Sequence, residues 1–228
     1  MNPPTKSEEL FKKYCANQGF AVEKIPEGTE KTPDFLVSTS QGQLIAEIKE
    51  LCPSAEDKKI ILEKGGTIRK TFGKRVGEKI KLAKRKKFVN TAIPRIIILF
   101  DNIVVRDRNV VANDAPFLPN YYITPEDIAF GMYGELKTTI LYDKAKGKIV
   151  GTRSDLGKNQ HLRSDEGREI SAVCVLTGNS EDIAPFLYTF HSVFASIPLP
   201  RAIFMGPKDK HFKNPVSGDT FETSWIEF

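Results

Sequence analysis

Residues 33–49 read PDFLVSTSQGQLIAEIK, two runs of apolar and β-branched residues on either side of Gln41-Gly42. Runs of this kind, separated by a short glycine-containing turn, are typical of a β-hairpin. We therefore predict strands at Phe35–Thr39 and Gln43–Leu51 that pair antiparallel, and Pro53 ends the second of them. The hairpin determines which side chains of the segment share a face.

Polar side chains gather at one end of this hairpin. Side chains alternate along a strand, so Glu47 and Lys49 point to the same face. Antiparallel pairing brings the start of the first strand beside the end of the second, and Asp34 stands at that start. We expect two carboxylates and one ammonium group to converge there. The opposite face is left for packing by Leu44, Ala46 and Ile48.

This set of groups suits the hydrolysis of a phosphodiester bond. Asp34 and Glu47 offer the hard oxygen ligands that Mg²⁺ prefers, and the backbone carbonyl of Ile48 is a further candidate ligand. A metal ion held there lowers the pKa of a bound water and offsets charge on the phosphate. Lys49 is placed to orient the attacking hydroxide or to stabilise the developing negative charge. The alternative is a surface hairpin in which Glu47 and Lys49 face solvent and Asp34 caps a turn.

Helices and strands are predicted on both sides of the hairpin. Apolar residues at helical spacing, followed by a glycine, predict a helix over Ser7–Gln18, and alternation predicts a strand at Ala21–Ile25. The expected order over the first hundred residues or so is α-β-β-β-α-β, an α/β arrangement. After the hairpin this order continues with an amphipathic helix on Val76, Ile80, Ala83 and Phe88 and a buried strand at Arg95–Phe100, and Ala55–Lys64 is a further candidate helix.

The second half of the chain carries weaker signals. Thr124-Pro125-Glu126-Asp127 combines a capping residue, a first-turn proline and acids near the helix dipole, and so marks a helix start. We expect a single domain overall, with a core at residues 1–111 and a C-terminal extension at 112–228 packed on it. The remaining predicted elements are a hairpin of Lys137–Tyr142 and Lys148–Thr152, a long polar loop at Arg153–Arg168, and strands at Ile170–Leu176 and Phe186–His191.

The basic residues of the chain are concentrated in one segment. Lys58–Lys87 holds thirteen basic and two acidic residues, a net charge of +11, which leaves −6 for the rest of a chain whose total is +5. Such a block attracts polyanions and speeds their encounter, although charge runs also occur on ordinary solvated helix faces. In the expected topology the block follows directly on the strand that carries Glu47 and Lys49.

Pro33-Asp34 and, after a twelve-residue gap, Glu47-Ile48-Lys49 resemble the motif of the PD-(D/E)xK nuclease superfamily, which includes restriction endonucleases and archaeal Holliday-junction resolvases. The resemblance covers roughly residues 7–102. It implies a restriction-endonuclease-like core, with a central mixed sheet flanked by helices and a mixed C-terminal extension. It also implies a magnesium-dependent endonuclease that hydrolyses phosphodiester bonds of nucleic acid, with DNA as the expected substrate. Mn²⁺ is expected to substitute for Mg²⁺. Such enzymes commonly act as dimers so that both strands are cut. The resemblance therefore makes a homodimer a candidate oligomeric state of this chain.

Members of the family often add a carboxylate from the first helix, where Glu8 and Glu9 both stand. Glu9 lies nearly opposite the apolar stripe of that helix, and Glu8 lies at its edge. The segment from Glu8 to Phe20 resembles the resolvase pattern, in which the first of these acids is the ligand, so Glu8 is the predicted residue. The helix after the motif commonly contributes a polar or basic residue; the candidates are Lys74, Arg75 and Lys79, and no spacing rule decides among them. Contacts with nucleic acid are expected from Lys70, Lys74, Arg75, Lys79, Lys81, Lys84 and Arg85.

Composition narrows the class of protein. The chain has 228 residues, 40% hydrophobic and 28% charged, as in ordinary globular domains. No apolar run approaches the ~18 residues of a membrane span, and no apolar signal core follows Met1. Cys15, Cys52 and Cys174 are scattered and indicate free thiols in a reducing compartment, so we expect a cytoplasmic protein that does not bind membranes.

Other candidate sites are weaker. The segment Gly65–Arg75 lacks the glycine spacing, the hydroxyl residue and the preceding strand of a phosphate-binding loop. His161, His191 and His211 have no metal-ligand spacing with a cysteine, and no nucleophile triad is evident. The main alternative function is a catalytically inactive nucleic-acid-binding protein that keeps the nuclease fold, and the intact motif argues against it. A small-molecule enzyme in the C-terminal half is a residual alternative.

Overall fold

The computed structural model describes residues 3–26, 32–52, 73–86, 92–101, 123–134, 136–143, 147–156, 161–178, 184–214, 216–217, 220–221 and 225–228. These residues form three helices, α1 (Lys6–Asn17), α3 (Lys74–Lys84) and α4 (Pro125–Tyr133). The helix predicted at Ala55–Lys64 and the predicted nucleic-acid contact Lys70 lie outside the described residues.

Eight of the described strands form one mixed sheet in the order β1-β2-β3-β4-β7-β8-β9-β12. Neighbours pair antiparallel from β1 to β3, parallel from β3 to β7, and then antiparallel, parallel and antiparallel to β12. The predicted α/β class with a mixed sheet is therefore confirmed. The strands are β1 (Ala21–Lys24), β2 (Phe35–Thr39), β3 (Gly42–Leu51), β4 (Arg95–Asp101), β7 (Ala172–Thr177), β8 (Phe186–His191), β9 (Lys210–Lys213) and β12 (Ile226–Glu227).

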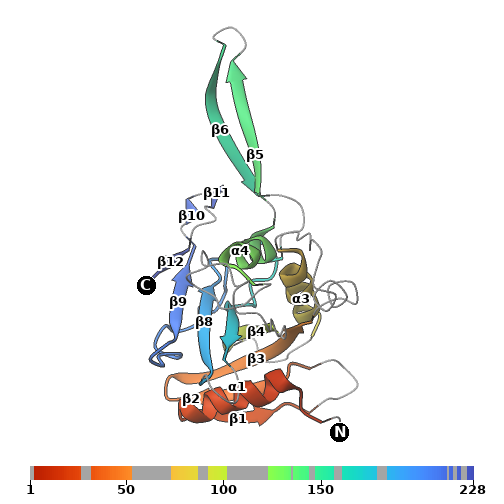
Figure 1. Ribbon diagram of the computed structural model, residues 1–228, viewed down its shortest axis with the longest axis vertical. Helices are drawn as coiled ribbons and strands as arrows, with labels where there is room; N and C mark the ends of the chain where they lie inside the picture. Colours follow the sequence, from red (N-terminus) through yellow and green to blue (C-terminus); the bar gives the residue numbers. More distant parts are fainter. Residues whose placement is uncertain are drawn as a thin grey trace, which may run out of the picture.

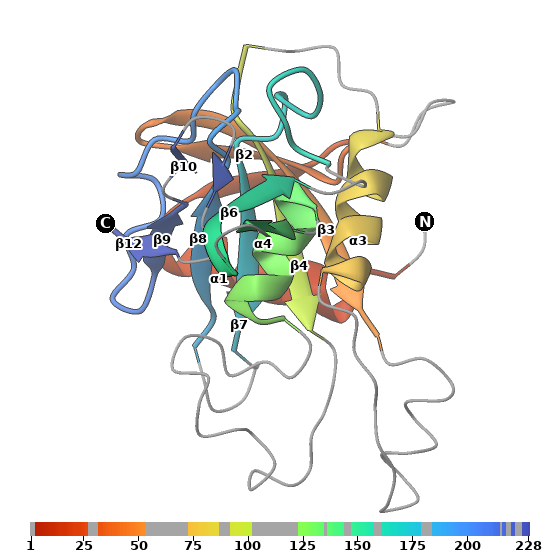
Figure 2. The same cartoon turned by 90° about the horizontal axis from the view of Figure 1, so that it is seen from above.

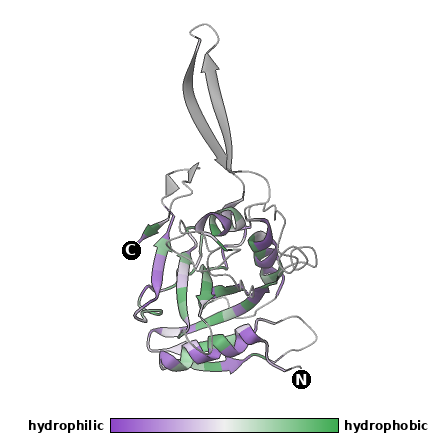
Figure 3. Ribbon diagram, in the orientation of Figure 1, coloured by the Kyte–Doolittle hydropathy of each residue, from purple (hydrophilic) through white to green (hydrophobic). Residues whose placement is uncertain are grey.

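Apolar residues cover both faces of this sheet. On one face the stripe of α1, which includes Phe11 and Tyr14, packs on Leu44, Ala46 and Ile48 of β3. On the other face α3 and α4 lie side by side over the sheet (Figures 1 and 2). In Figure 3 the central strands are coloured mainly as hydrophobic, whereas much of α3 is coloured as hydrophilic. Because side chains alternate along β3, Glu47 and Lys49 belong to the face covered by α3.

The starts of the helices follow from local sequence. Thr124 caps α4 in a capping box with Asp127, which confirms the helix start predicted there. Gly73 stands at the start of α3 with φ 73°, a conformation that favours glycine. The N–H of Gly73 donates to Asp127 Oδ1 at 3.0 Å, so the two helices are joined at this end.

The sequence from Leu136 to Leu156 forms a separate two-stranded ribbon of β5 (Leu136–Asp143) and β6 (Lys148–Leu156). Figure 1 shows this ribbon as an arm that projects from the body beyond α4. The predicted hairpin is confirmed. The prediction of a long loop over Arg153–Arg168 is wrong for its first four residues. Residues 153–156 continue β6 and pair with β5 as far as Leu136.

Two further short strands, β10 (Val216–Ser217) and β11 (Thr220–Phe221), pair with each other. No helix in the described part of the chain is long and apolar enough to cross a membrane.

Candidate active site

The pairing of β2 with β3 places Asp34 beside Glu47. Phe35 is paired with Ala46, so the residue before Phe35 faces the residue after Ala46. Asp34 Oδ2 accepts a hydrogen bond from the backbone N–H of Ile48 at 2.7 Å, which fixes the carboxylate against β3. The structure thus brings together the two carboxylates that the sequence singles out. The amide of Ile48 serves Asp34, and the carbonyl of Ile48 stays a predicted metal ligand.

Glu47 is a fully buried carboxylate, with 0% of its side chain exposed. Its Oε1 contacts the ammonium group of Lys49 and lies 2.8 Å from Nζ of Lys86. Its Oε2 has no hydrogen-bond or ion-pair partner among the described residues. The surface-hairpin interpretation is therefore wrong for Glu47, which is enclosed between the sheet and α3.

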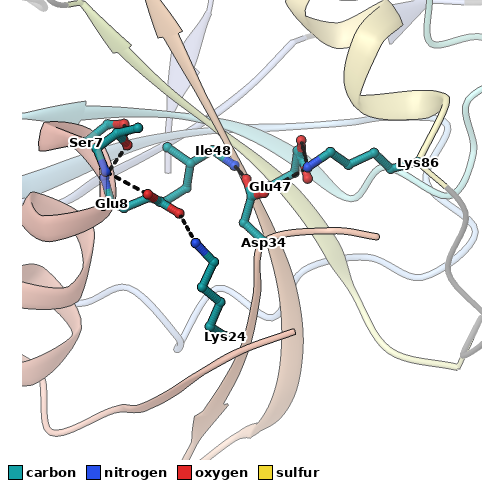
Figure 4. Close-up of polar contacts among 8 residues, drawn as sticks. Ser7, Glu8, Lys24, Asp34, Glu47, Ile48 and Lys86 are labelled. Atoms are coloured by element: carbon teal, nitrogen blue, oxygen red, sulfur yellow. Dashed lines mark hydrogen bonds and ion pairs between the residues drawn. The ribbon is translucent and has the colours of Figure 1, made fainter. Parts of the chain in front are cut away.

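Lys86 joins the two carboxylates. Its Nζ lies 2.8 Å from Asp34 Oδ1 and 2.8 Å from Glu47 Oε1, and its side chain is 17% exposed. In Figure 4 it reaches Asp34 and Glu47 from the side opposite to Glu8 and Lys24. Sequence reasoning did not select Lys86, because no spacing rule distinguishes it from its basic neighbours in Lys58–Lys87.

The charges of these groups are coupled. Burial raises the pKa of Glu47 above its ordinary value, and the nearby charge of Asp34 raises it further, whereas Lys49 and Lys86 oppose this. Burial alone would lower the pKa of Lys86, but hydrogen bonds to Asp34 and Glu47 more than compensate and raise it. The ammonium group of Lys86 therefore compensates the negative charge of both carboxylates.

Arg95 is a second basic residue that sequence reasoning missed. It is buried at the start of β4, and its Nη2 donates to the carbonyl of Ala83 in the last turn of α3 at 2.5 Å. Burial lowers the pKa of Arg95, and attraction to Glu47 partly offsets the effect. Arg95 thus ties the end of α3 to the sheet and adds positive charge near Glu47.

The predicted first-helix carboxylate, Glu8, has two partners of its own. Its Oε2 accepts from the backbone N–H of Thr5 at 2.7 Å within a capping box, and its Oε1 lies 2.9 Å from Nζ of Lys24. Burial raises the pKa of Glu8, but the bonds to Thr5 and Lys24 outweigh this and lower it. Figure 4 shows the Glu8–Lys24 pair and the Asp34–Glu47 pair on opposite sides of Ile48. In this structure Glu8 caps α1, and its catalytic role stays a prediction; its neighbour Glu9 is exposed.

The predicted nucleic-acid residues differ in their availability. Lys74, Lys81 and Arg85 are exposed along α3 and its end, and Arg75 and Lys79 are partly buried. Lys84 is engaged elsewhere, because its Nζ donates to the carbonyl of His161 at 2.8 Å and to Glu166 at 2.6 Å. The exposed surface of α3 is therefore basic, and Lys84 fastens the helix to the segment 161–166.

The donors of the site fit a divalent cation. The carboxylates of Asp34 and Glu47 meet at one point, and Glu47 Oε2 has no partner among the described residues. The ammonium group of Lys86 bridges the two carboxylates, which shows that positive charge is accommodated there. Mg²⁺ is commonly bound by one or two carboxylates, with waters and substrate phosphate completing its shell. No group of three or more histidine, cysteine or acidic side chains suited to a metal ion occurs in the described part of the chain.

The histidines and cysteines lie apart from this arrangement. His191 Nε2 lies 2.8 Å from His211 Nδ1, so these two histidines are hydrogen-bonded to each other. Cys15, Cys52 and Cys174 are free thiols, as predicted.

Comparisons of the chain with protein-family models, with curated proteins and with solved structures returned no match.

Proposed function

We propose that this chain is a magnesium-dependent endonuclease that hydrolyses phosphodiester bonds of nucleic acid, with DNA as the expected substrate. The observation that carries the proposal is the meeting of Asp34 and the buried Glu47 around one positive charge. A buried carboxylate is costly unless positive charge compensates it, so a metal ion that replaces an ammonium group here would stabilise the carboxylate pair. A second ammonium group, that of Lys49, contacts Glu47 at the same point.

The order of elements supports a restriction-endonuclease-like core. The described elements run α1, β1, β2, β3, α3 and β4, which is the order that the PD-(D/E)xK resemblance implies. The first three strands pair antiparallel and β4 joins β3 in parallel, with α1 and α3 on opposite faces. The motif residues lie where β2 starts and where β3 approaches its end.

Each residue of the site has a distinct role in the proposed reaction. Asp34 and Glu47 would hold Mg²⁺, which supplies a Lewis acid that activates water and offsets charge on the phosphate. Lys49, whose side chain is partly exposed, would orient the attacking water and stabilise negative charge on the scissile phosphate. The backbone N–H of Ile48 keeps Asp34 in position.

Binding of the substrate would come largely from α3. Its exposed cations, including Lys74, Lys81 and Arg85, suit contacts with a phosphate backbone. Such contacts carry no sequence information by themselves, and they weaken steeply as salt concentration rises.

The proposal is tested by cleavage of plasmid, single-stranded and branched DNA with Mg²⁺ or Mn²⁺, against an EDTA control. We expect metal-dependent cleavage by the wild type. Asp34→Asn and Lys49→Met are each expected to reduce it by at least about 100-fold, because removal of a catalytic group typically has an effect of this size. Circular dichroism and salt-sensitive DNA retention on a gel are expected to be unchanged.

The matched controls are Glu23→Gln and Lys6→Met, which change exposed charges on β1 and α1. Both are expected to cut at the rate of the wild type. If Asp34→Asn or Lys49→Met cuts nearly as fast as the wild type, the catalytic assignment is wrong.

A second candidate function is a catalytically inactive nucleic-acid-binding protein with the same fold. Lys86 favours it, because an ammonium group that already bridges Asp34 and Glu47 neutralises the site without a metal ion. DNA retention without cleavage of any of the three substrates would favour this second candidate.

A further inference from the structure

We infer that Lys86 is an internal counter-ion that competes with a divalent cation for Asp34 and Glu47, and that cation binding releases its side chain toward a substrate phosphate. The release toward phosphate rests on the proposed nuclease function. The competition itself rests only on the geometry of the carboxylate pair.

The first argument is that both cations would be held by the same two carboxylates. Nζ of Lys86 lies 2.8 Å from Asp34 Oδ1 and 2.8 Å from Glu47 Oε1. Mg²⁺ held by Asp34 and Glu47 would compete with this ammonium group, because both cations bind carboxylate oxygens. Two like charges in contact at a buried site repel strongly.

The second argument is the balance of charge. Two carboxylates at the site face the ammonium groups of Lys49 and Lys86, and Arg95 adds an attractive interaction with Glu47. The ammonium groups of Lys49 and Lys86 therefore already match the two carboxylates before a metal ion arrives. A divalent cation added to this set is favoured only if one of the positive groups leaves.

The third argument identifies Lys86 as the group that leaves. Arg95 is buried and bonded to Ala83. Lys49 contacts Glu47, whereas Lys86 bridges both carboxylates. Lys86 follows the last turn of α3, on a flexible four-carbon stem. The helix end is itself fixed through Lys84, which is bonded to Glu166 and to the carbonyl of His161. The side chain of Lys86 can therefore move without displacing α3.

Its destination would be the phosphate backbone of the substrate. The exposed Lys81 and Arg85 lie close to Lys86 in the chain, so a released ammonium group would join a basic surface. Binding of the metal ion would in this way add one contact between the protein and a substrate phosphate.

The test measures Mn²⁺ binding by calorimetry in the absence of nucleic acid. Lys86→Met removes the ammonium group and keeps most of the stem. We expect this variant to bind Mn²⁺ at least about tenfold more tightly than the wild type, the effect of removing one competing charge. Lys6→Met, which removes an exposed lysine of α1, is expected to bind Mn²⁺ like the wild type. Equal or weaker binding by Lys86→Met, or no binding by either protein, would overturn the inference.

A second measurement needs no variant and therefore does not depend on how Lys86→Met folds. The wild-type protein is acetylated briefly with an amine-reactive ester, with and without Mn²⁺, and each lysine is quantified by mass spectrometry. Labelling of Lys86 is expected to increase severalfold with Mn²⁺, whereas Lys6 stays constant. Unchanged labelling of Lys86 contradicts its release.

The two proposals fail in different ways. Cleavage by the wild type together with unchanged Mn²⁺ affinity in Lys86→Met would overturn the inference and leave the nuclease proposal standing. Tighter Mn²⁺ binding by Lys86→Met without cleavage by the wild type would support the competition and reject the nuclease.

Discussion

Glu47 shows at the scale of one residue why the site needs positive charge. The side chain has no exposed surface, and burial together with Asp34 raises its pKa. Removal of a charge partner from a buried carboxylate typically costs several kcal/mol, on the order of 3–5 kcal/mol. The contacts of Lys49 and Lys86 with Glu47 therefore stabilise the folded state and also form part of the site.

The pair of His191 and His211 gives a prediction about pH. Burial lowers the pKa of His191 to about 4, and the charges of His211 and Arg201 add to the effect. Burial also lowers the pKa of His211, although its bond to the carbonyl of Phe204 opposes this. Between pH 6.5 and about 4 the unfolded chain binds protons that the folded chain does not, so stability falls as the pH is lowered through this range.

We expect His191→Gln to lose less stability than the wild type between pH 7 and pH 4.5. The difference would be at most roughly 3 kcal/mol, because one pKa unit corresponds to about 1.4 kcal/mol. Urea unfolding at several pH values measures it. Parallel pH curves for the two proteins would show that His191 does not contribute.

At the same scale, sequence reasoning succeeded where local geometry determines position. Asp34, Glu47 and Lys49 are brought together by alternation along β3 and by the register of one hairpin, and both can be read from the sequence. Lys86 contacts Glu47 from the end of α3, and Arg95 at the start of β4 adds positive charge near it. Their positions depend on how α3 and β4 pack on β3, and no pattern in the sequence encodes that packing.

At the scale of elements, the contact between α3 and α4 depends on glycine. A Cβ atom added at Gly131 would lie 2.8 Å from Cβ of Val76 and 3.1 Å from the backbone nitrogen of Gly77. The helices cannot separate easily, because Gly73 is bonded to Asp127 across the same junction. The close approach places α3 over β3 and thus holds Lys86 near the carboxylates.

We therefore expect Gly131→Ala to destabilise the protein by about 1–2 kcal/mol, since overpacking outweighs the helix preference of alanine of about 1 kcal/mol. Denaturant unfolding measures the loss. Gly19→Asn is the control: Gly19 has φ 72°, a conformation that asparagine tolerates, and open space surrounds its Cβ position. A Gly131→Ala variant as stable as the wild type would show that the two helices can move apart.

The strands were predicted best where apolar runs are continuous. The predicted Phe35–Thr39 agrees with β2, and Arg95–Phe100 falls one residue short of the end of β4. The error at Arg153–Arg168 arose because residues 153–155 are polar, and the strand conformation of residues 153–156 comes from pairing with β5. Such pairing depends on the partner strand, which the local composition does not reveal.

At the scale of the whole molecule, the two halves of the chain share one sheet. β7 pairs with β4 in parallel, and β8, β9 and β12 continue from it, so residues after 171 complete the sheet that carries the site. The sequence predicted strands in this half but not their place in the sheet. Parallel pairing between distant segments follows from the packing of both faces, not from a local turn.

The β5–β6 ribbon stands apart from this sheet, and its removal tests how far the body folds without it. Its strands pair with each other, and Figure 1 shows them projecting beyond α4. The chain that follows returns to α4, because the N–H groups of His161 and Leu162 donate to the carbonyl of Met132 at 3.2 and 2.8 Å. A short Gly-Ser linker in place of residues 136–156 therefore closes a small loop at little entropic cost.

We expect the shortened protein to unfold cooperatively with a Tm within about 4 °C of the full chain, since about 1 kcal/mol shifts the Tm of a chain of this size by roughly 2–4 °C. Mn²⁺ binding at Asp34 and Glu47 is expected to be unchanged, because both residues lie at the β2–β3 pairing and not in the ribbon. Calorimetry measures both quantities on the same samples. Loss of cooperative unfolding would show that the ribbon is part of the folding unit. Weaker Mn²⁺ binding with an unchanged Tm would instead show that the ribbon affects the carboxylate site from a distance.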